Sequence, residues 1–267
     1  MITKYKTFLS RQDLAANTVR SYVWTVTHFL EKYKEVTREN LLAYKGCLVE
    51  RHKPQTVNLR LQALNKYLEF IKKEKLKMRF VKVQQKNFLE NVISDADYKF
   101  FKTRLKKDGY TSWYFVVWFL TATGARVSEL LQIKAEHVQQ GYLDIYSKGG
   151  KLRRLYIPKT LRSEAMNWLK ERRLNSGYIF LNRFGERITA RGIAQQLKLF
   201  AGKYGINTAV VYPHSFRHRF AKNFLDRFND LALLADLMGH ESIETTRIYL
   251  RRTATEQQAI VDKIVNW

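Results

Sequence analysis

The sequence predicts a mainly α-helical protein with a small β-sheet (an α+β fold), divided into two domains. Three observations lead to this prediction. Hydrophobic residues make up 45% of the 267 residues, which is enough for a packed core. Residues 1 to about 75 repeat their apolar side chains at helical spacing, whereas a β-prone segment follows later in the chain. Between these parts, the strongly basic run at residues 72–86 breaks the helical pattern and is typical of a linker.

Three helices are expected before the basic run. The first covers residues 17–33 with Asn17 as a candidate N-cap, the second covers 37–52 and begins near Thr37, and the third covers 55–75 and follows Pro54. We therefore expect a helical domain at residues 1–76, a basic linker at 77–90 and a second domain at 91–267.

The second domain is expected to be mixed. Ser94 or Asp95 caps a helix at 94–105, and residues 111–124 are apolar on nearly all sides, which predicts a buried helix that ends at Gly124. Two β-prone runs within residues 141–158 flank a Lys-Gly-Gly-Lys turn, which predicts a hairpin. Further helices are expected at 160–173, 189–205, 214–228, 230–239 and 242–250, followed by an amphipathic segment at 254–265.

The charge of the chain points to a polyanionic partner. Lys and Arg number 48 against 24 acidic residues, a net charge of +24 that is spread along the whole sequence. Nucleic acid is the first candidate and an anionic membrane surface the second, but a spread charge favours a long polyanion. The longest apolar run, residues 113–120, is far shorter than the roughly 20 residues that span a bilayer. We expect no membrane partner and a cytoplasmic, nucleoid-associated protein.

Most cofactor and metal motifs are absent from the sequence. There is no Gly-rich phosphate loop, no GxGxxG, no HExxH and no Cys-His finger spacing. The single cysteine, Cys47, excludes an internal disulfide and fits a reducing cytosol. The carboxylates do not cluster as they do in two-metal nucleases. We therefore expect no cofactor and no metal, and the candidate chemistry that remains is cationic.

Four short segments carry that chemistry, and each is weak when taken alone. Arg126 follows the glycine that ends the apolar helix, and Lys148 lies at the tip of the predicted hairpin. His214 and Arg217 share one helix face because they are three residues apart, next to a helix N-terminus that favours anions. His240 follows Gly239 in a turn, and Tyr249 lies one short helix further on, as one of 15 tyrosines.

The order of these segments is more specific than any one of them. "TGARVSEL", a hairpin lysine, "HSFRHRFA" and "LMGHESIETTRIY" together resemble the tyrosine recombinase family, the phage-integrase and Xer-type site-specific recombinases. "NTVRSYVWTVTHFL" and "QTVNLRLQALNKYLEFI" resemble the SAM-like core-binding DNA-binding domain of that family, so the resemblance covers nearly the whole chain. Phe216 departs from the common leucine, and Arg219 stands where a threonine often follows.

The resemblance implies a role for each of these residues. The catalytic set is Arg126, Lys148, His214, Arg217, His240 and the nucleophile Tyr249, with Glu129 and His218 in support. Two further cations, Lys151 and Arg153, lie close to Lys148 in the sequence. The cations expected to contact DNA are Arg20, Lys66, Lys72, Lys73, Lys82, Lys151 and Arg153.

The implied reaction cuts and rejoins DNA through a 3′-phosphotyrosyl intermediate, without metal or ATP. Two arginines bind the charge of the phosphate, His214 accepts the phenol proton or orients the phenol, and Lys148 protonates the leaving 5′-oxygen. The family implies a homotetramer on two DNA sites, and the lack of an arm-binding domain before residue 1 favours simple inverted core sites.

Several alternatives stay open from the sequence alone. A type IB topoisomerase-like enzyme that relaxes DNA would use the same chemistry as a recombinase. A catalytically idle DNA-binding protein is the third hypothesis. The outcome could be integration, excision, inversion or dimer resolution. Residues 254–266 could dock on their own domain or on a neighbouring protomer.

Overall fold

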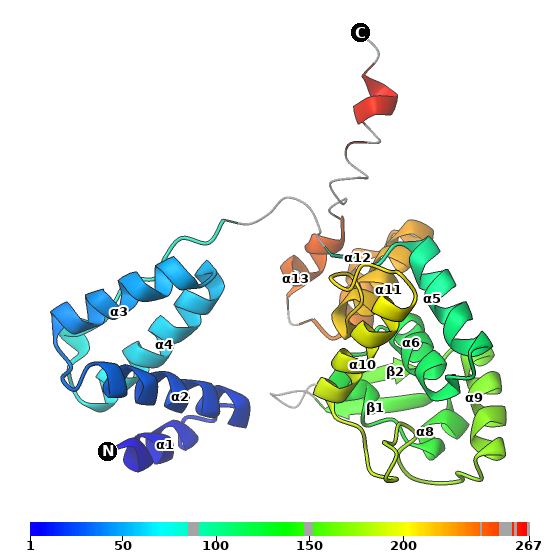
Figure 1. Ribbon diagram of the computed structural model, residues 1–267, viewed down its shortest axis with the longest axis horizontal. Helices are drawn as coiled ribbons and strands as arrows, with labels where there is room; N and C mark the ends of the chain where they lie inside the picture. The colour runs from blue at the N-terminus through cyan, green and yellow to red at the C-terminus, as the bar shows by residue number, and fades with distance from the viewer. Residues whose placement is uncertain (85–90, 147–151, 241, 251–257, 259–260, 266–267) are drawn as a thin grey trace. The chain divides into compact units, whose positions relative to one another are not determined.

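The protein consists of two compact units, Met1–Gln85 and Lys86–Trp267, and each is described by itself (Figure 1). The computed structural model describes residues 1–84, 91–146, 152–240, 242–250, 258 and 261–265. The boundary between the units lies within residues 77–90, the range expected for the linker. The predicted fold class, mainly helical with a small β-sheet, is confirmed.

The first unit is a helical bundle around its own apolar core. Its helices are α1 (Ile2–Ser10), α2 (Ala16–Lys32), α3 (Arg38–Arg51), α4 (Pro54–Phe70) and the 3-10 helix η1 (Glu74–Leu76). Thr37 caps α3 by accepting the backbone N–H of Asn40, as the sequence predicts. Asn17 is not a cap, because α2 already begins at Ala16, and α1 was not predicted as a separate helix.

The second unit is built around the apolar helix α6. Its α-helices are α5 (Asp95–Lys107), α6 (Thr111–Thr123), α7 (Val127–Leu130), α8 (Ala135–Gln140), α9 (Lys159–Glu171), α10 (Ala190–Lys203), α11 (Pro213–Phe228), α12 (Leu231–Met238) and α13 (Ile243–Arg247). α6 packs against α5, α9 and α11, which explains why its sequence is apolar on nearly all sides (Figure 1). Ser94 caps α5, and Gly124 ends α6 with a left-handed backbone, both as expected.

The predicted hairpin is confirmed in its two strands. β1 (Tyr142–Tyr146) pairs antiparallel with β2 (Leu152–Tyr156), in a register from Tyr142 opposite Tyr156 to Tyr146 opposite Leu152. Leu143, Ile145 and Leu155 turn one face of the pair toward the core. The expected turn, with Lys148 and Lys151, lies outside the described residues.

The C-terminal part of the second unit forms a smaller cluster. Residues 242–250, expected as one helix, are instead the short α13 followed by the 3-10 helix η2 (Ile248–Leu250). Apolar side chains of α11 and α12 pack under η2 in a cluster separate from the main core. In the expected amphipathic segment at 254–265, residues 261–264 are helical.

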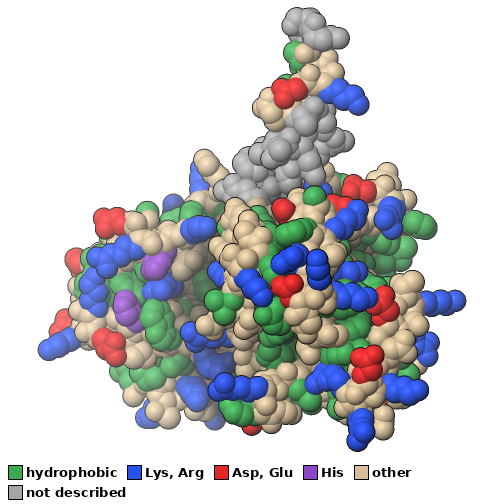
Figure 2. Space-filling model, turned by 45° about the vertical axis from the view of Figure 1, so that its right-hand side comes forward, with side chains coloured by type: hydrophobic (Ala, Val, Ile, Leu, Met, Phe, Trp, Pro, Cys, Tyr) green, Lys and Arg blue, Asp and Glu red, His purple; other side chains and the backbone are tan. Residues whose placement is uncertain are grey.

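Charge is distributed widely over the surface. Figure 2 shows Lys and Arg side chains scattered across the visible face, in keeping with the net charge of +24. No helix in the part of the chain that the structure describes is both long and apolar enough to cross a membrane.

Candidate active site

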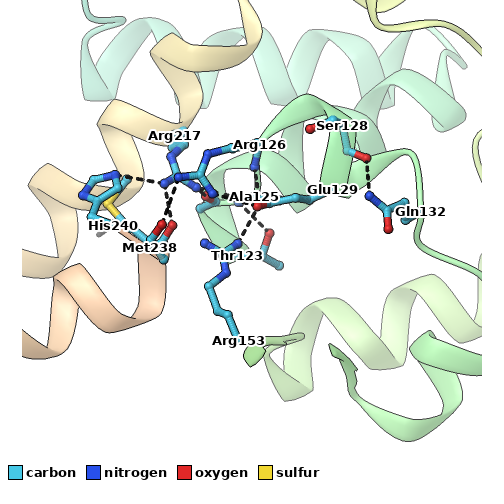
Figure 3. Close-up of polar contacts among 12 residues, drawn as sticks. Thr123, Ala125, Arg126, Ser128, Glu129, Gln132, Arg153, Arg217, Met238 and His240 are labelled. Carbon is cyan, nitrogen blue, oxygen red and sulfur yellow. Dashed lines mark hydrogen bonds and ion pairs between the residues drawn. The ribbon is translucent and has the colours of Figure 1, made fainter. Parts of the chain in front are cut away.

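A buried carboxylate organises the candidate site. Glu129 lies in α7, and its Oε2 accepts the backbone N–H of Arg126 at 2.7 Å, which starts the helix. Its Oε1 accepts Nη1 of Arg126 at 2.8 Å, and its Oε2 also accepts Nη2 of Arg153 at 2.7 Å. In Figure 3, Arg153 reaches toward Glu129 from the strand side, at the bottom of the view. One acidic side chain therefore holds two guanidiniums.

The two sequence-predicted arginines meet at the C-terminal turn of α12. Arg126, 38% exposed in its side chain, donates from Nη2 to the carbonyl of Gly239 at 3.0 Å. Arg217, only 2% exposed, donates from Nη2 to the carbonyl of Met238 at 2.7 Å and from Nη1 to the carbonyl of Gly124. Burial, and then the charge of Arg126, lowers the pKa of Arg217 to about 10, so its guanidinium stays charged at neutral pH.

His240 belongs to the same turn. Its Nε2 lies 3.1 Å from Nη2 of Arg217, and its Nδ1 lies 2.8 Å from the hydroxyl of Thr246, which is fully buried. A guanidinium can only donate, so Nε2 accepts and the proton of the neutral ring sits on Nδ1. Burial, followed by the charges of Arg217 and Arg126, lowers the pKa of His240 to about 4.

Tyr249 lies against this histidine. Its ring is parallel to that of His240 within 12°, with centroids 6.1 Å apart, and the centroid of His218 is 5.3 Å away. The residue is 6% exposed in η2. Burial raises the pKa of the Tyr249 phenol, whereas the charge and hydrogen bond of Arg217 act in the opposite direction. The buried tyrosine is thus already beside the cation that would favour its ionised form.

The two histidines of α11 follow one another along the helix. His214 lies in the first turn, directly after Pro213, and its ring centroid is 6.4 Å from that of His218. Desolvation, followed by the charge of Arg217, lowers the pKa of His214. Burial, followed by the charges of His214 and Arg217, lowers the pKa of His218 to about 4. Both imidazoles are therefore neutral at physiological pH and able to accept a proton.

A cavity of about 760 Å³ opens next to these groups. Arg126, Arg153 and His240 line its polar part, and Leu152, Tyr156 and Leu237 line its apolar part. The polar part presents positive charge to an anion, with Glu129 behind it. Among the described residues, no group of three His, Cys, Asp or Glu side chains is arranged to hold a metal ion.

With this geometry in view, comparison with known proteins identifies the family. The family model described as phage integrase family matches residues 89–256. Tyrosine recombinase XerA of Pyrococcus furiosus is 30% identical over 272 residues, covering 98% of this chain and 93% of the relative.

The chain belongs to the phage integrase family.

Solved structures agree with this family fold. The crystal structure of XerA recombinase matches with a TM-score of 0.57 at 20% identity, over 100% of this chain and 98% of that one. A lambda integrase dimer bound to a COC′ core site matches with a TM-score of 0.72 at 16% identity, over 92% of this chain and 93% of that one. This phage integrase family member is an enzyme of the tyrosine recombinase class, which cuts and rejoins DNA strands. The topoisomerase-like and catalytically idle alternatives find no support in these comparisons.

In this phage integrase family member, the structure brings together most of the predicted catalytic residues. Arg126, Arg217, His240 and Tyr249 are connected by the contacts above, with Glu129 and His218 beside them. Lys148 lies outside the described residues, so its assignment stays a prediction. Arg219, at the position where a threonine is common, donates from Nε to the carbonyl of Ile93 at 2.9 Å.

The residues predicted to contact DNA differ in their surroundings. Arg20, Lys72, Lys73 and Lys82 are exposed in the first unit, and Lys66 forms an ion pair with Glu69 at 2.9 Å. Lys151 lies outside the described residues. Arg153 differs from the expectation, because its side chain is only 9% exposed and faces Glu129. The strand pattern could have indicated this, since Arg153 is two residues before the buried Leu155 and therefore on the same face of β2.

Proposed function

We propose that this enzyme recombines specific DNA sites, with Tyr249 as the nucleophile that forms a 3′-phosphotyrosyl bond. The observation that carries the proposal is the convergence on Tyr249. Arg217 hydrogen-bonds to one buried phenol, the charge of Arg126 also acts on it, and the ring of His240 lies parallel to it, although these residues lie far apart in the sequence. A tyrosine held only for packing has no need of this charge beside it.

The substrate in this proposal is double-stranded DNA with inverted core sites. The net charge of +24 supports a polyanion, and a lambda integrase of the same fold has been solved on a core site. The exposed cations of the first unit, Arg20, Lys72, Lys73 and Lys82, are proposed phosphate contacts. Binding should weaken with salt, with a slope of about −0.9 in log K against log [salt] for each phosphate neutralised.

The arginines act on the phosphate during in-line attack. As Oη of Tyr249 approaches phosphorus, negative charge builds on the non-bridging oxygens and the bond to O5′ breaks. Arg126 and Arg217 would stabilise that charge with bidentate hydrogen bonds to the phosphate. These would replace the hydrogen bonds that the two arginines donate to the carbonyls of Gly239 and Met238 in the structure. Guanidiniums that rest on backbone acceptors are already oriented toward the site.

Neutral histidines would move the protons. The phenol proton goes to His214, whose lowered pKa keeps its ring neutral at physiological pH and therefore able to accept a proton. His218 packs against the phenol. An anionic phosphate would raise the pKa of His240, and once Arg217 turns to the phosphate, a proton on Nε2 allows His240 to donate as well. Lys148 would protonate the leaving 5′-oxygen.

The covalent bond to Tyr249 conserves the energy of the phosphodiester. A 5′-hydroxyl from a partner strand can attack that bond, release the phenol and complete the exchange without ATP or a metal ion. We propose that a homotetramer on two sites aligns the strands. Native mass spectrometry of the complex with a two-site DNA tests this stoichiometry, and a complex with two protomers only would contradict it.

A nicked suicide substrate tests the proposed function. Cleavage next to the nick releases a short fragment, so the covalent complex cannot religate and resists denaturation. Wild-type protein should form the adduct, and Tyr249→Phe should bind the same DNA without forming it. An adduct formed by Tyr249→Phe would show that the nucleophile is another residue.

A further inference from the structure

The position of Arg153 is costly for the fold. Its side chain is buried, and in the part of the chain that the structure describes, Nε and Nη1 are buried without a hydrogen-bond partner. Leaving such donors unsatisfied costs about 1–3 kcal/mol each. Within the described residues, the guanidinium makes one strong contact, from Nη2 to Oε2 of Glu129 at 2.7 Å. A residue placed at such a cost is better explained by the site than by stability.

Arg153 also packs on the turn that holds both catalytic arginines. A Cβ added to Gly239 would lie 2.5 Å from Cδ of Arg153, and 3.0 Å and 3.2 Å from Nη1 and Nε. The carbonyl of Gly239 accepts Arg126, and the preceding carbonyl of Met238 accepts Arg217. Arg153 can occupy this position only because residue 239 has no side chain. The packing of Arg153 against Gly239 therefore connects β2 with the α12 turn.

Two guanidiniums compete for one carboxylate oxygen. Oε2 of Glu129 is 2.7 Å from Nη2 of Arg153 and 3.9 Å from Nη1 of Arg217. Oε1 is already taken by Arg126. If Arg153 were absent, Oε2 would lose its charged partner. Apart from Arg126, which already holds Oε1, Arg217 would be the nearest cation among the described residues to replace it. An ion pair with Glu129 would then hold Arg217 away from the phosphate.

We propose that Arg153 is a positioning residue, which occupies Oε2 of Glu129 and thereby leaves Arg217 free for the scissile phosphate. The inference rests on the proposed function, since it concerns the same cleavage step. Arg153 acts through Glu129 and the α12 turn and does not itself touch the DNA. Figure 3 shows the arrangement, with Arg217 beside Arg126 in the upper part of the view and Arg153 below Glu129.

The main experiment compares Arg153→Met with Arg154→Met in single-turnover cleavage of the nicked substrate at saturating DNA. Arg154 is the matched control, because it is the next residue on β2 and pairs with Asp144, at 2.7 Å. Arg153→Met should cleave about 10–100-fold more slowly, as expected for a displaced reacting group, with unchanged DNA affinity. Arg154→Met should cleave at the wild-type rate. A wild-type rate for Arg153→Met would overturn the proposal.

A second background separates positioning from a structural role. Glutamine at position 129 carries no charge and cannot form an ion pair with Arg217, so Arg153→Met should slow cleavage less than about threefold when added to Glu129→Gln. An equal loss in both backgrounds would show that Arg153 acts independently of Glu129, and the proposal would be wrong.

A conservative variant covers the case in which Arg153→Met does not fold. Arg153→Lys keeps a positive partner for Oε2 and should cleave within about threefold of wild type, whereas a direct guanidinium role predicts a loss of about 10²–10³-fold. The larger loss overturns the proposal. A wild-type protein that forms no adduct would instead overturn the proposed function, which keeps the two failures distinct.

Discussion

Replacing Arg217 by lysine tests whether the planar guanidinium, with its several hydrogen-bond donors, is needed in addition to the positive charge. The buried side chain serves the carbonyls of Gly124 and Met238 as well as Nε2 of His240, in three directions. A lysine ammonium is a single point at the end of a flexible stem and cannot meet all three with the same geometry. The substitution keeps the positive charge but removes the planar guanidinium group.

The structure sets two magnitudes for Arg217→Lys. One buried carbonyl left without a donor costs about 1–3 kcal/mol of unfolding free energy. For a unit of this size, each kcal/mol corresponds to roughly 2–4 °C in Tm, so Tm should fall by about 2–12 °C. The loss of one preorganised donor to the transition state should slow cleavage by about 10²–10³-fold.

The assay is single-turnover cleavage of the nicked substrate, with thermal unfolding followed by circular dichroism on the same samples. Arg172→Lys is the control, because Arg172 also donates to a backbone carbonyl, that of Ile179 at 3.2 Å, but lies outside the site. The control should lose some stability and keep its cleavage rate. Cleavage by Arg217→Lys within threefold of wild type would refute the reasoning that the fork binds the phosphate.

Three further predictions follow from the same contacts. His218 and His240 have a pKa of about 4 in the folded protein and 6.5 in the unfolded chain, so the unfolded state binds more protons at acidic pH. Stability should therefore drop as pH falls from about 6.5 toward 4, measured as Tm. An equal drop in Tm in the double variant His218→Gln/His240→Gln would show that these two histidines do not cause it. Thr246→Val removes the acceptor for Nδ1 of His240 and should slow cleavage about 5–10-fold, a loss of about 1 kcal/mol, while the exposed Thr245→Val should not. Gly124→Ala should lower Tm more than Gly109→Ala. Both glycines have a positive φ, but of the two only Gly124 would place an added Cβ against a neighbour, the ring of Phe220. An equal decrease in Tm would mean that backbone strain alone causes the destabilisation.

Local chemistry made much of the fold predictable. Thr37 and Ser94 cap helices because their hydroxyls satisfy free backbone N–H groups a few residues away, and Gly124 ends α6 because it tolerates a left-handed backbone. The hairpin strands follow from two β-prone runs that flank a Gly-Gly pair in the sequence. These features depend on neighbours in the sequence, so the sequence alone indicates them.

A short helix without apolar periodicity was missed, and so were features that depend on tertiary contacts. The short helix α7 exists because Glu129 accepts the backbone N–H of Arg126, and no apolar periodicity marks it. The sequence indicated residues that would act together but not how they meet, because the α12 turn collects Arg126 and Arg217 through backbone carbonyls. Arg153 was assigned to the DNA surface from its charge, although the alternation of β2 turns it toward Glu129.

The most direct test of the account is the identity of the residue that becomes covalently attached to DNA. The trapped complex can be digested with nuclease and protease, and the peptide that carries the remaining nucleotides sequenced by tandem mass spectrometry. We expect the nucleotide mass on Tyr249, in the segment that follows Arg247. The same mass on another residue, such as the nearby Tyr212, would contradict it.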